Sequence, residues 1–123
     1  MGYASKNNIN MKEKITIYQK PTCSKCRATL AILRDSGVEF ESVNYYETPL
    51  TEENIRDLLD KLNLSLRDIL RKDEPLAKDL GAVSDDALIK IMLENPDLIQ
   101  RPIVVRGNKA RLCRPPENVN ELL

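Results

Sequence analysis

Apolar residues recur with two different spacings near the start of this chain. Ile15 and Ile17 alternate with polar neighbours in residues 15–18, a pattern typical of a half-buried strand. From residue 24 the spacing becomes helical, and the predicted helix ends at Gly37 because glycine readily takes the left-handed conformation found at helix C-termini. Apolar residues in 38–46 predict a second strand. A strand–helix–strand unit of this kind usually makes its two strands parallel neighbours in one sheet.

Helical spacing dominates the middle of the chain. Thr51 predicts an N-cap, and Ile55, Leu58, Leu59 and Leu62 follow at intervals that place them on one helix face. The remaining predicted elements are, in chain order, a short helix over 65–71, a brief turn from Pro75, a helix capped by Ser84 and ending near Asn95-Pro96, a strand over 103–105, a hairpin turn at Gly107-Asn108, a strand over 110–113 and a short helix from Pro115. Together these elements predict one α/β domain over residues 13–123.

Composition limits the function classes that remain open. The 123 residues are 41% hydrophobic and 31% charged, which fits a soluble globular domain rather than a disordered chain. Nineteen basic residues balance nineteen acidic ones, so no overall field favours nucleic acid or an anionic membrane surface. No apolar run approaches the roughly 18 residues that span a bilayer. Residues 1–12 are polar and predict a flexible N-terminal tail or a cloning remnant rather than a secretory signal.

The stretch "KPTCSKCRATL" contains two of the three cysteines, and Cys23 lies at the predicted junction between the first strand and the first helix. The start of a helix presents unpaired N–H groups and a partial positive charge, which stabilise an anion there. Lys25 and Arg27 add formal positive charge nearby. Such surroundings lower the pKa of a thiol from about 8.5, so Cys23 is a candidate nucleophile. The chain has no histidine, which excludes a Cys-His catalytic pair.

Cys26, one helical turn after Cys23, allows several interpretations. It is close enough in sequence to form a disulfide with Cys23, and it also falls on the apolar stripe of the predicted helix, where a cysteine is often a small core residue. A zinc site would need four ligands, and the chain offers three cysteines and no second CxxC motif, so no bound metal is expected. An odd number of cysteines without a signal peptide favours a reducing cytoplasm.

Arginines stand beside turns or strand ends in three short stretches of the second half of the chain. These are "ILRKDEP" with Arg71, "IQRPIVV" with Arg101, and "RLCRPPE" with Arg111 and Arg114. A lone arginine is usually a solvated surface charge. Several guanidinium groups converging on Cys23 would instead bind a tetrahedral oxyanion and favour the thiolate. Spacing alone does not show such convergence.

The chain resembles the glutaredoxin-coupled arsenate reductases, the ArsC family, whose wider superfamily includes Spx-type regulators. The resemblance runs from about residue 15 to 119 and rests on "ITIYQKPTCSKCRATL", "GVEFESVNYYETPLT", "ILRKDEP", "NPDLIQRPIVV" and "RLCRP". It implies a thioredoxin-like fold, a small mixed β-sheet flanked by helices, with a helical insertion. It also implies that Cys23 is the nucleophile, that Arg71, Arg101 and Arg114 form the oxyanion site, and that Pro102 is a cis-proline facing the redox cysteine.

The resemblance implies a reaction as well. The Cys23 thiolate attacks arsenate, glutathione as co-substrate then reduces the arsenic and leaves a mixed disulfide on Cys23, and glutaredoxin, or thioredoxin, regenerates the thiol. No bound cofactor is implied, and a cytoplasmic monomer that binds neither nucleic acid nor membrane is expected. Cys113 in "RLCRP" is interpreted as a packed strand cysteine.

The second cysteine departs from the pattern of the plain reductases, which usually carry another residue where Cys26 stands. A CxxC motif is typical of the redox-sensing regulators, so an Spx-like switch that binds RNA polymerase is the alternative, with a general thiol-disulfide oxidoreductase as a third. "RLCRP" and Arg114 favour the reductases, because a regulator has no evident need for an oxyanion site. Cys26, with Arg27, is therefore expected to have a resolving or accessory role.

Overall fold

The computed structural model describes residues 13–123, so the predicted tail over residues 1–12 lies outside the described residues. The strands are β1 (Ile15–Gln19), β2 (Phe40–Asn44), β3 (Ile103–Arg106) and β4 (Lys109–Leu112). The α-helices are α2 (Ser24–Ser36), α3 (Glu52–Leu62), α4 (Pro75–Lys78) and α5 (Asp85–Glu94). Three 3₁₀ helices complete the order: η1 (Leu66–Ile69), η2 (Pro96–Leu98) and η3 (Pro116–Leu122).

The four strands form one mixed sheet in the order β2-β1-β3-β4. The strands β1 and β2 are parallel, as the strand–helix–strand pattern predicts, and the β3–β4 hairpin adds antiparallel to β1. The thioredoxin-like α/β architecture expected from the sequence is confirmed. Among the described residues, no helix has the length and apolar character needed to cross a membrane.

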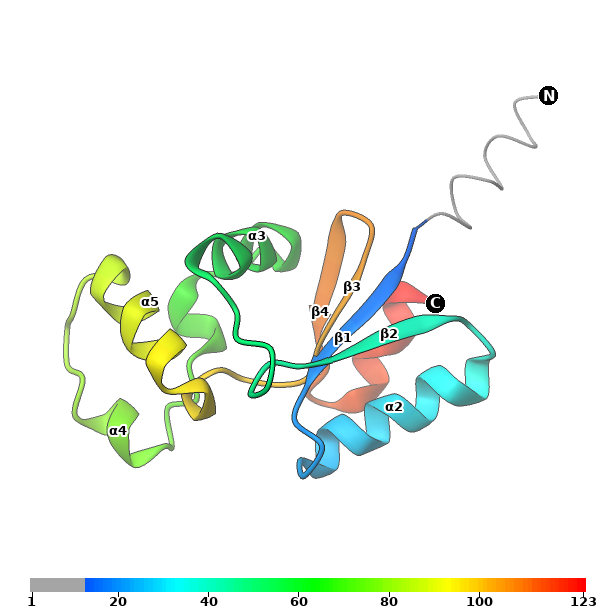
Figure 1. Ribbon diagram of the computed structural model, residues 1–123, viewed down its shortest axis with the longest axis horizontal. Coiled ribbons are helices and arrows are strands. Elements are labelled where there is room, and N and C mark those ends of the chain that lie inside the picture. The colour runs from blue at the N-terminus through cyan, green and yellow to red at the C-terminus, as the bar shows by residue number, and fades with distance from the viewer. Residues whose placement is uncertain (1–12) are drawn as a thin grey trace.

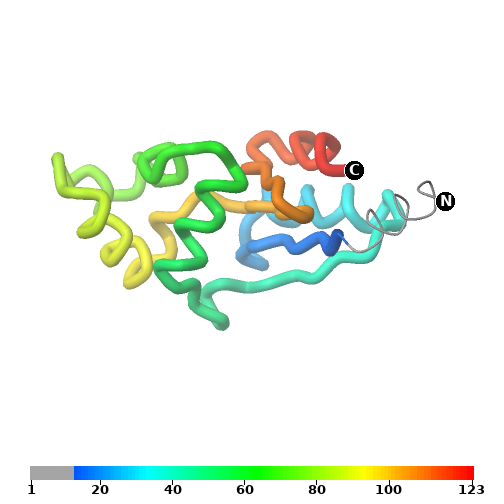
Figure 2. The backbone as a smooth tube through the Cα atoms, turned by 90° about the horizontal axis from the view of Figure 1, so that it is seen from above, coloured from blue at the N-terminus to red at the C-terminus, as the bar shows by residue number. Residues whose placement is uncertain are grey.

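Alternation along the strands sends apolar side chains to both faces of the sheet. Ile15, Ile17 and Val104 pack on one face against Leu30 and Leu33 of α2. The C-terminal η3 lies beside α2 on this face (Figures 1 and 2). The sheet is therefore the middle layer between α2 with η3 and the helices on its other face.

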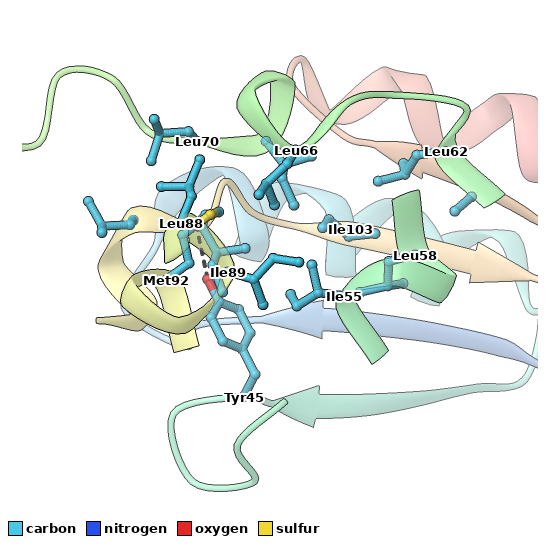
Figure 3. Close-up of a cluster of buried hydrophobic side chains, with 14 of the residues drawn as sticks. Tyr45, Ile55, Leu58, Leu62, Leu66, Leu70, Leu88, Ile89, Met92 and Ile103 are labelled. Carbon is cyan, nitrogen blue, oxygen red and sulfur yellow. Dashed lines mark hydrogen bonds between the residues drawn. The ribbon is translucent and has the colours of Figure 1, made fainter. Parts of the chain in front are cut away.

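The second core joins the opposite face of the sheet to the helical insertion. Ile103 meets side chains of α3 and α5 there, among them Ile55, Leu58 and Met92 (Figure 3). The hydroxyl of Tyr45 donates a hydrogen bond to the carbonyl of Ile99 at 3.2 Å. The helical insertion, drawn in green and yellow at one end of the molecule in Figure 1, therefore packs firmly against the sheet.

The predicted helix caps are confirmed, but the second strand is shorter than predicted. Thr51 accepts a hydrogen bond from the N–H of Asn54, and Gly37 ends α2 in the left-handed conformation at φ 78°. The strand predicted over 38–46 is wrong at both ends, because pairing with β1 begins at Phe40 and stops at Asn44. The two tyrosines that follow lie in a turn, where their side chains point toward the helical insertion and the neighbouring loops.

Candidate functional site

The register of the sheet brings four chain segments to one edge. Tyr18, near the end of β1, pairs with Val43 near the end of β2 and with Ile103 at the start of β3. Ile103 in turn pairs with Leu112, the last residue of β4. The loops beyond these strand ends carry Cys23, the tyrosine turn, the segment 95–102 and the segment 113–115. Residues that are distant in the sequence therefore meet at this edge.

Cys23 is the N-cap residue of α2 and is half-buried. Partial burial disfavours its thiolate, but hydrogen bonding from Cys26 and from the backbone N–H of Lys25, together with the charge of Arg101, outweighs that effect and lowers the pKa of Cys23. No N–H lies in full capping geometry to the sulfur. The N–H groups at the helix start nevertheless favour the negative form.

Cys26 lies one turn further along α2 and is fully buried. Burial raises the pKa of the Cys26 thiol to about 12, so it stays protonated at neutral pH, and its hydrogen bonding lowers the pKa of Cys23. The interpretation of Cys26 as a core residue of the α2 stripe is confirmed. A disulfide with Cys23 stays a prediction, and both cysteines are free.

Arg101 is the charged residue that the fold buries beside Cys23. Its side chain is only 7% exposed, and within residues 13–123 its Nε and Nη1 atoms have no hydrogen-bond partner. Its positive charge acts on the sulfur of Cys23 and on the hydroxyls of Tyr45 and Tyr46. Burying a guanidinium with two of its nitrogen atoms unpaired is costly, and an oxyanion at this position would satisfy them.

Arg114 reaches the same place through the chain that follows β4. The N–H of Cys113 donates to the carbonyl of Pro102 at 2.9 Å, and Nη1 of Arg114 donates to the carbonyl of Arg101 at 2.9 Å. The peptide bond between Arg101 and Pro102 is cis, as predicted. The bond between Arg114 and Pro115 is also cis, which was not predicted.

Arg71 enters from the helical insertion. Its N–H donates to the carbonyl of Leu98 at 2.7 Å, next to an isolated bridge between Leu70 and Ile99. Its guanidinium donates to the carbonyl of Asp97 at 3.5 Å and lies 3.4 Å from the carboxylate of Glu74. The three arginines are thus connected through the segment 97–101, although Arg71 already has a carboxylate partner.

Two cations proposed from the sequence to act on Cys23 are exposed on α2. Lys25 contributes its backbone N–H to the site, whereas Arg27 points to solvent and its accessory role stays a prediction. Cys113 is fully buried and burial raises the pKa of its thiol to about 12, which confirms that it is packed, although it lies one residue past the end of β4 rather than in the strand. Arg111 pairs with Glu121 at 2.6 Å instead of joining the cluster.

Three further residues, not predicted from the sequence, lie at the rim of the site. Lys20 forms an ion pair with Asp97 at 3.3 Å, its Nζ lies 4.7 Å from the centre of the Tyr46 ring, and the hydroxyl of Tyr46 donates to the same Asp97 oxygen. Lys20 stands in the quoted cysteine motif, but nothing in the spacing connects it with a residue 77 positions later.

Comparisons with known proteins agree on one family. Residues 18–122 match the model described as "ArsC family". An arsenate reductase of Escherichia coli K12 is 43% identical over 113 residues, covering 89% of this chain and 80% of that protein. A second protein of the same strain, the uncharacterized YfgD, is 46% identical over 118 residues and covers 92% and 99% of the two chains.

Solved structures extend the likeness to three dimensions. An arsenate reductase from Vibrio cholerae superimposes with a TM-score of 0.85 at 42% identity, covering 90% of this chain and 98% of that one. A putative arsenate reductase from Yersinia pestis superimposes with a TM-score of 0.83 at 42% identity, covering 88% and 99%. Both alignments span nearly the full length of the solved chains, so the sheet and the helical insertion are shared together.

Proposed function

The chain belongs to the ArsC family, and we propose that it is an arsenate reductase that uses the thiolate of Cys23 to convert arsenate to arsenite. One observation of the structure carries this proposal. The guanidinium of Arg101 is buried beside a thiol of lowered pKa, and its Nε and Nη1 atoms have no hydrogen-bond partner in the described part of the chain. A tetrahedral oxyanion at this position would satisfy the guanidinium and stand next to the nucleophile.

In the proposed first step, the Cys23 thiolate attacks arsenic and forms a sulfur–arsenic bond, while one As–O bond breaks and its oxygen leaves as water after protonation. Arg101 neutralises charge that would otherwise repel the attacking thiolate, and Arg114 and Arg71 are proposed to complete the anion site. In the second step, a glutathione thiolate attacks the sulfur of Cys23. The sulfur–arsenic bond breaks with its electron pair on arsenic, so As(V) becomes As(III) while two thiols are oxidised to a mixed disulfide.

Glutaredoxin, or thioredoxin, is the proposed reductant of this mixed disulfide. No cofactor bound to the protein is needed, because the electrons come from thiols. Cys23 is partly exposed, which a mixed disulfide with an external thiol requires. Glutathione-dependent chemistry of this kind suits the reducing cytoplasm that the cysteine content favours.

The proposal is tested by arsenite production in a mixture of the purified protein, arsenate, glutathione and glutaredoxin. We expect arsenite to accumulate at many times the rate of the mixture without the protein. Thioredoxin with its reductase replaces glutaredoxin in a parallel series and identifies the donor. Absence of arsenite with both donors, in protein whose thiol is reduced, would refute the reductase.

The lowered pKa of Cys23 gives a prediction about pH. A thiol with a lowered pKa carries more thiolate at pH 7 than an ordinary cysteine, and the thiolate is the form that reacts with iodoacetamide. The alkylation rate of Cys23 should therefore rise with pH through a midpoint below the ordinary thiol range. Peptide mapping after alkylation assigns the rate to Cys23. A midpoint at or above that of free cysteine contradicts the prediction.

Cys26 supports a second candidate role, a redox switch or internal resolution through a Cys23–Cys26 disulfide, because it lies one helical turn after Cys23 and its hydrogen bonding lowers the pKa of Cys23. We expect Cys26→Ala to raise the pKa of Cys23, since the variant removes a donor to the thiolate. The expected change in alkylation rate at pH 7 is about two- to fivefold, the effect of losing one such hydrogen bond. An unchanged pH profile would show that Cys26 serves packing alone.

Arsenite assays of Cys26→Ser separate the two roles of Cys26. If the glutathione route operates, this variant keeps most of the activity with glutathione and glutaredoxin, because an external thiol resolves Cys23. Complete loss of activity in a folded Cys26→Ser variant would instead make Cys26 the resolving thiol, and would place this chain apart from reductases with one reactive cysteine.

A further inference from the structure

Three side chains from three separate segments meet at the rim of the site and are called the rim clamp here: Lys20, Tyr46 and Asp97, which lies in η2. Oδ1 of Asp97 accepts a hydrogen bond from the hydroxyl of Tyr46 and forms an ion pair with Nζ of Lys20 at 3.3 Å. The ammonium of Lys20 also lies 4.7 Å from the centre of the Tyr46 ring, a cation–π distance. Each member of the clamp therefore contacts the other two.

The clamp joins the turn before Cys23 to residues 97–101, which end in Arg101 and accept hydrogen bonds from Arg71 and Arg114; this stretch is called the arginine segment. Lys20 belongs to the turn before Cys23, and its carbonyl accepts a hydrogen bond from the N–H of Cys23 at 3.0 Å. Asp97 lies four residues before Arg101, and its carbonyl accepts from Nη1 of Arg71 at 3.5 Å. Apart from the sheet and the cores, the Lys20–Asp97 ion pair is thus a direct side-chain link between the two halves of the proposed anion site.

Tyr46 fixes the third side of the clamp. Its ring lies 5.0 Å from that of Tyr45, whose hydroxyl donates to the carbonyl of Ile99, two residues before Arg101. The tyrosine turn therefore supports Asp97 and the arginine segment together. Side chains that are already held by several contacts lose little conformational entropy when a ligand binds beside them. A site built on such side chains is preorganised.

We propose that Lys20, Tyr46 and Asp97 are positioning residues, which hold the Cys23 turn at a fixed separation from Arg101 so that the thiolate and the oxyanion site are formed before substrate arrives. This inference rests on Cys23 as the reactive thiol of the proposed function. The clamp needs an ionised Asp97 and a protonated Tyr46. The hydrogen bond from Tyr46 lowers the pKa of Asp97, and burial together with that bond raises the pKa of Tyr46, so both conditions hold at neutral pH.

The sign of the effect on the thiol distinguishes positioning from direct electrostatics. If Asp97 acted on Cys23 only through its charge, Asp97→Asn would remove a negative charge and lower the pKa of Cys23. Lys20→Met would remove a positive charge and raise it. A positioning role predicts the same sign for both variants, because either one releases the Cys23 turn from the arginine segment.

The experiment compares the rate of iodoacetamide alkylation of Cys23 against pH in wild type, Lys20→Met, Asp97→Asn and the double variant. We expect each single variant to reduce the rate at pH 6.5 by about two- to fivefold, within the range of a partly exposed ion pair, and the double variant to show no further loss. Tyr46→Phe should give a smaller change in the same direction. The matched controls are Lys90→Met and Asp79→Asn, which change the net charge equally at exposed positions away from the site.

Opposite signs for Lys20→Met and Asp97→Asn, or additive effects in the double variant, would overturn the positioning role. So would an unchanged pH profile accompanied only by a lower melting temperature, since a purely structural clamp affects folding without altering the thiol. The readout does not depend on arsenate. A protein that alkylates as expected but makes no arsenite would therefore refute the proposed function and leave the clamp intact.

Discussion

Replacing Cys23 with serine is expected to abolish arsenate reduction. Serine has nearly the same shape, but its hydroxyl stays protonated at neutral pH and cannot take the place of a thiolate that attacks arsenic or forms a mixed disulfide. The rate of arsenite formation with glutathione and glutaredoxin should fall by about a thousandfold or more, as removal of a nucleophile does in other enzymes. Cys23 is half-buried at a helix start, so the fold should be retained.

The control for this variant is Cys113→Ala. Cys113 is fully buried after β4 and its thiol has a pKa of about 12, so it carries no thiolate at neutral pH. We expect a small loss of stability from the missing sulfur and an unchanged arsenite rate per folded molecule. If Cys23→Ser kept activity while Cys113→Ala lost it, the nucleophile would be Cys113 and not Cys23.

Arg101→Met is expected to reduce kcat/KM for arsenate by about two to three orders of magnitude, the range for removing one preorganised donor to a developing charge. The same variant should not be less stable than wild type. Arg101 is buried with two nitrogen atoms unpaired among the described residues, so an apolar side chain of similar length removes an unfavourable burial. Loss of function together with equal or higher stability is the mark of a residue kept for its chemistry.

Thermal unfolding with and without arsenate completes this test. A ligand that binds only the native state raises the melting temperature, and we expect arsenate to do so in wild type and not in Arg101→Met. Arg111→Met is the matched control, because Arg111 on β4 pairs with Glu121 of η3, and this variant should leave both activity and stabilisation unchanged. Equal stabilisation of wild type and Arg101→Met by arsenate would place the anion elsewhere.

Local signals were sufficient to predict most of the fold. The predicted N-cap at Thr51 is confirmed, because its side chain accepts a hydrogen bond from the first turn of α3. The predicted end of α2 at Gly37 is confirmed as well, because this glycine takes the left-handed conformation. The end of β2 was misplaced because apolar residues continue past it. Tyr45 is buried, yet it packs against the helical insertion instead of pairing in the sheet, and periodicity along the chain does not distinguish these two environments.

The sequence was sufficient to predict candidate residues of the site, but not the contacts between them. The position of Cys23 at a strand–helix junction was visible in the sequence, but the burial of Arg101 and its two unpaired nitrogen atoms depends on the register between β1 and β3. The rim clamp was invisible for the same reason. In the sequence, nothing distinguishes Asp97 from other acidic residues near a helix end. Its contact with Lys20, 77 positions away, arises only when the strands of the sheet pair.

The intact mass of the Cys26→Ser protein after incubation with glutathione shows whether arsenate is reduced at Cys23. The protein is measured with and without arsenate, in the absence of glutaredoxin. Arsenate is then the only oxidant, and no internal thiol can remove an adduct from Cys23. We predict one glutathione attached to Cys23 for each arsenite released, and no adduct without arsenate. Arsenite formation without an adduct, or an adduct of equal amount in both samples, would contradict an account based on arsenate reduction at the sulfur of Cys23.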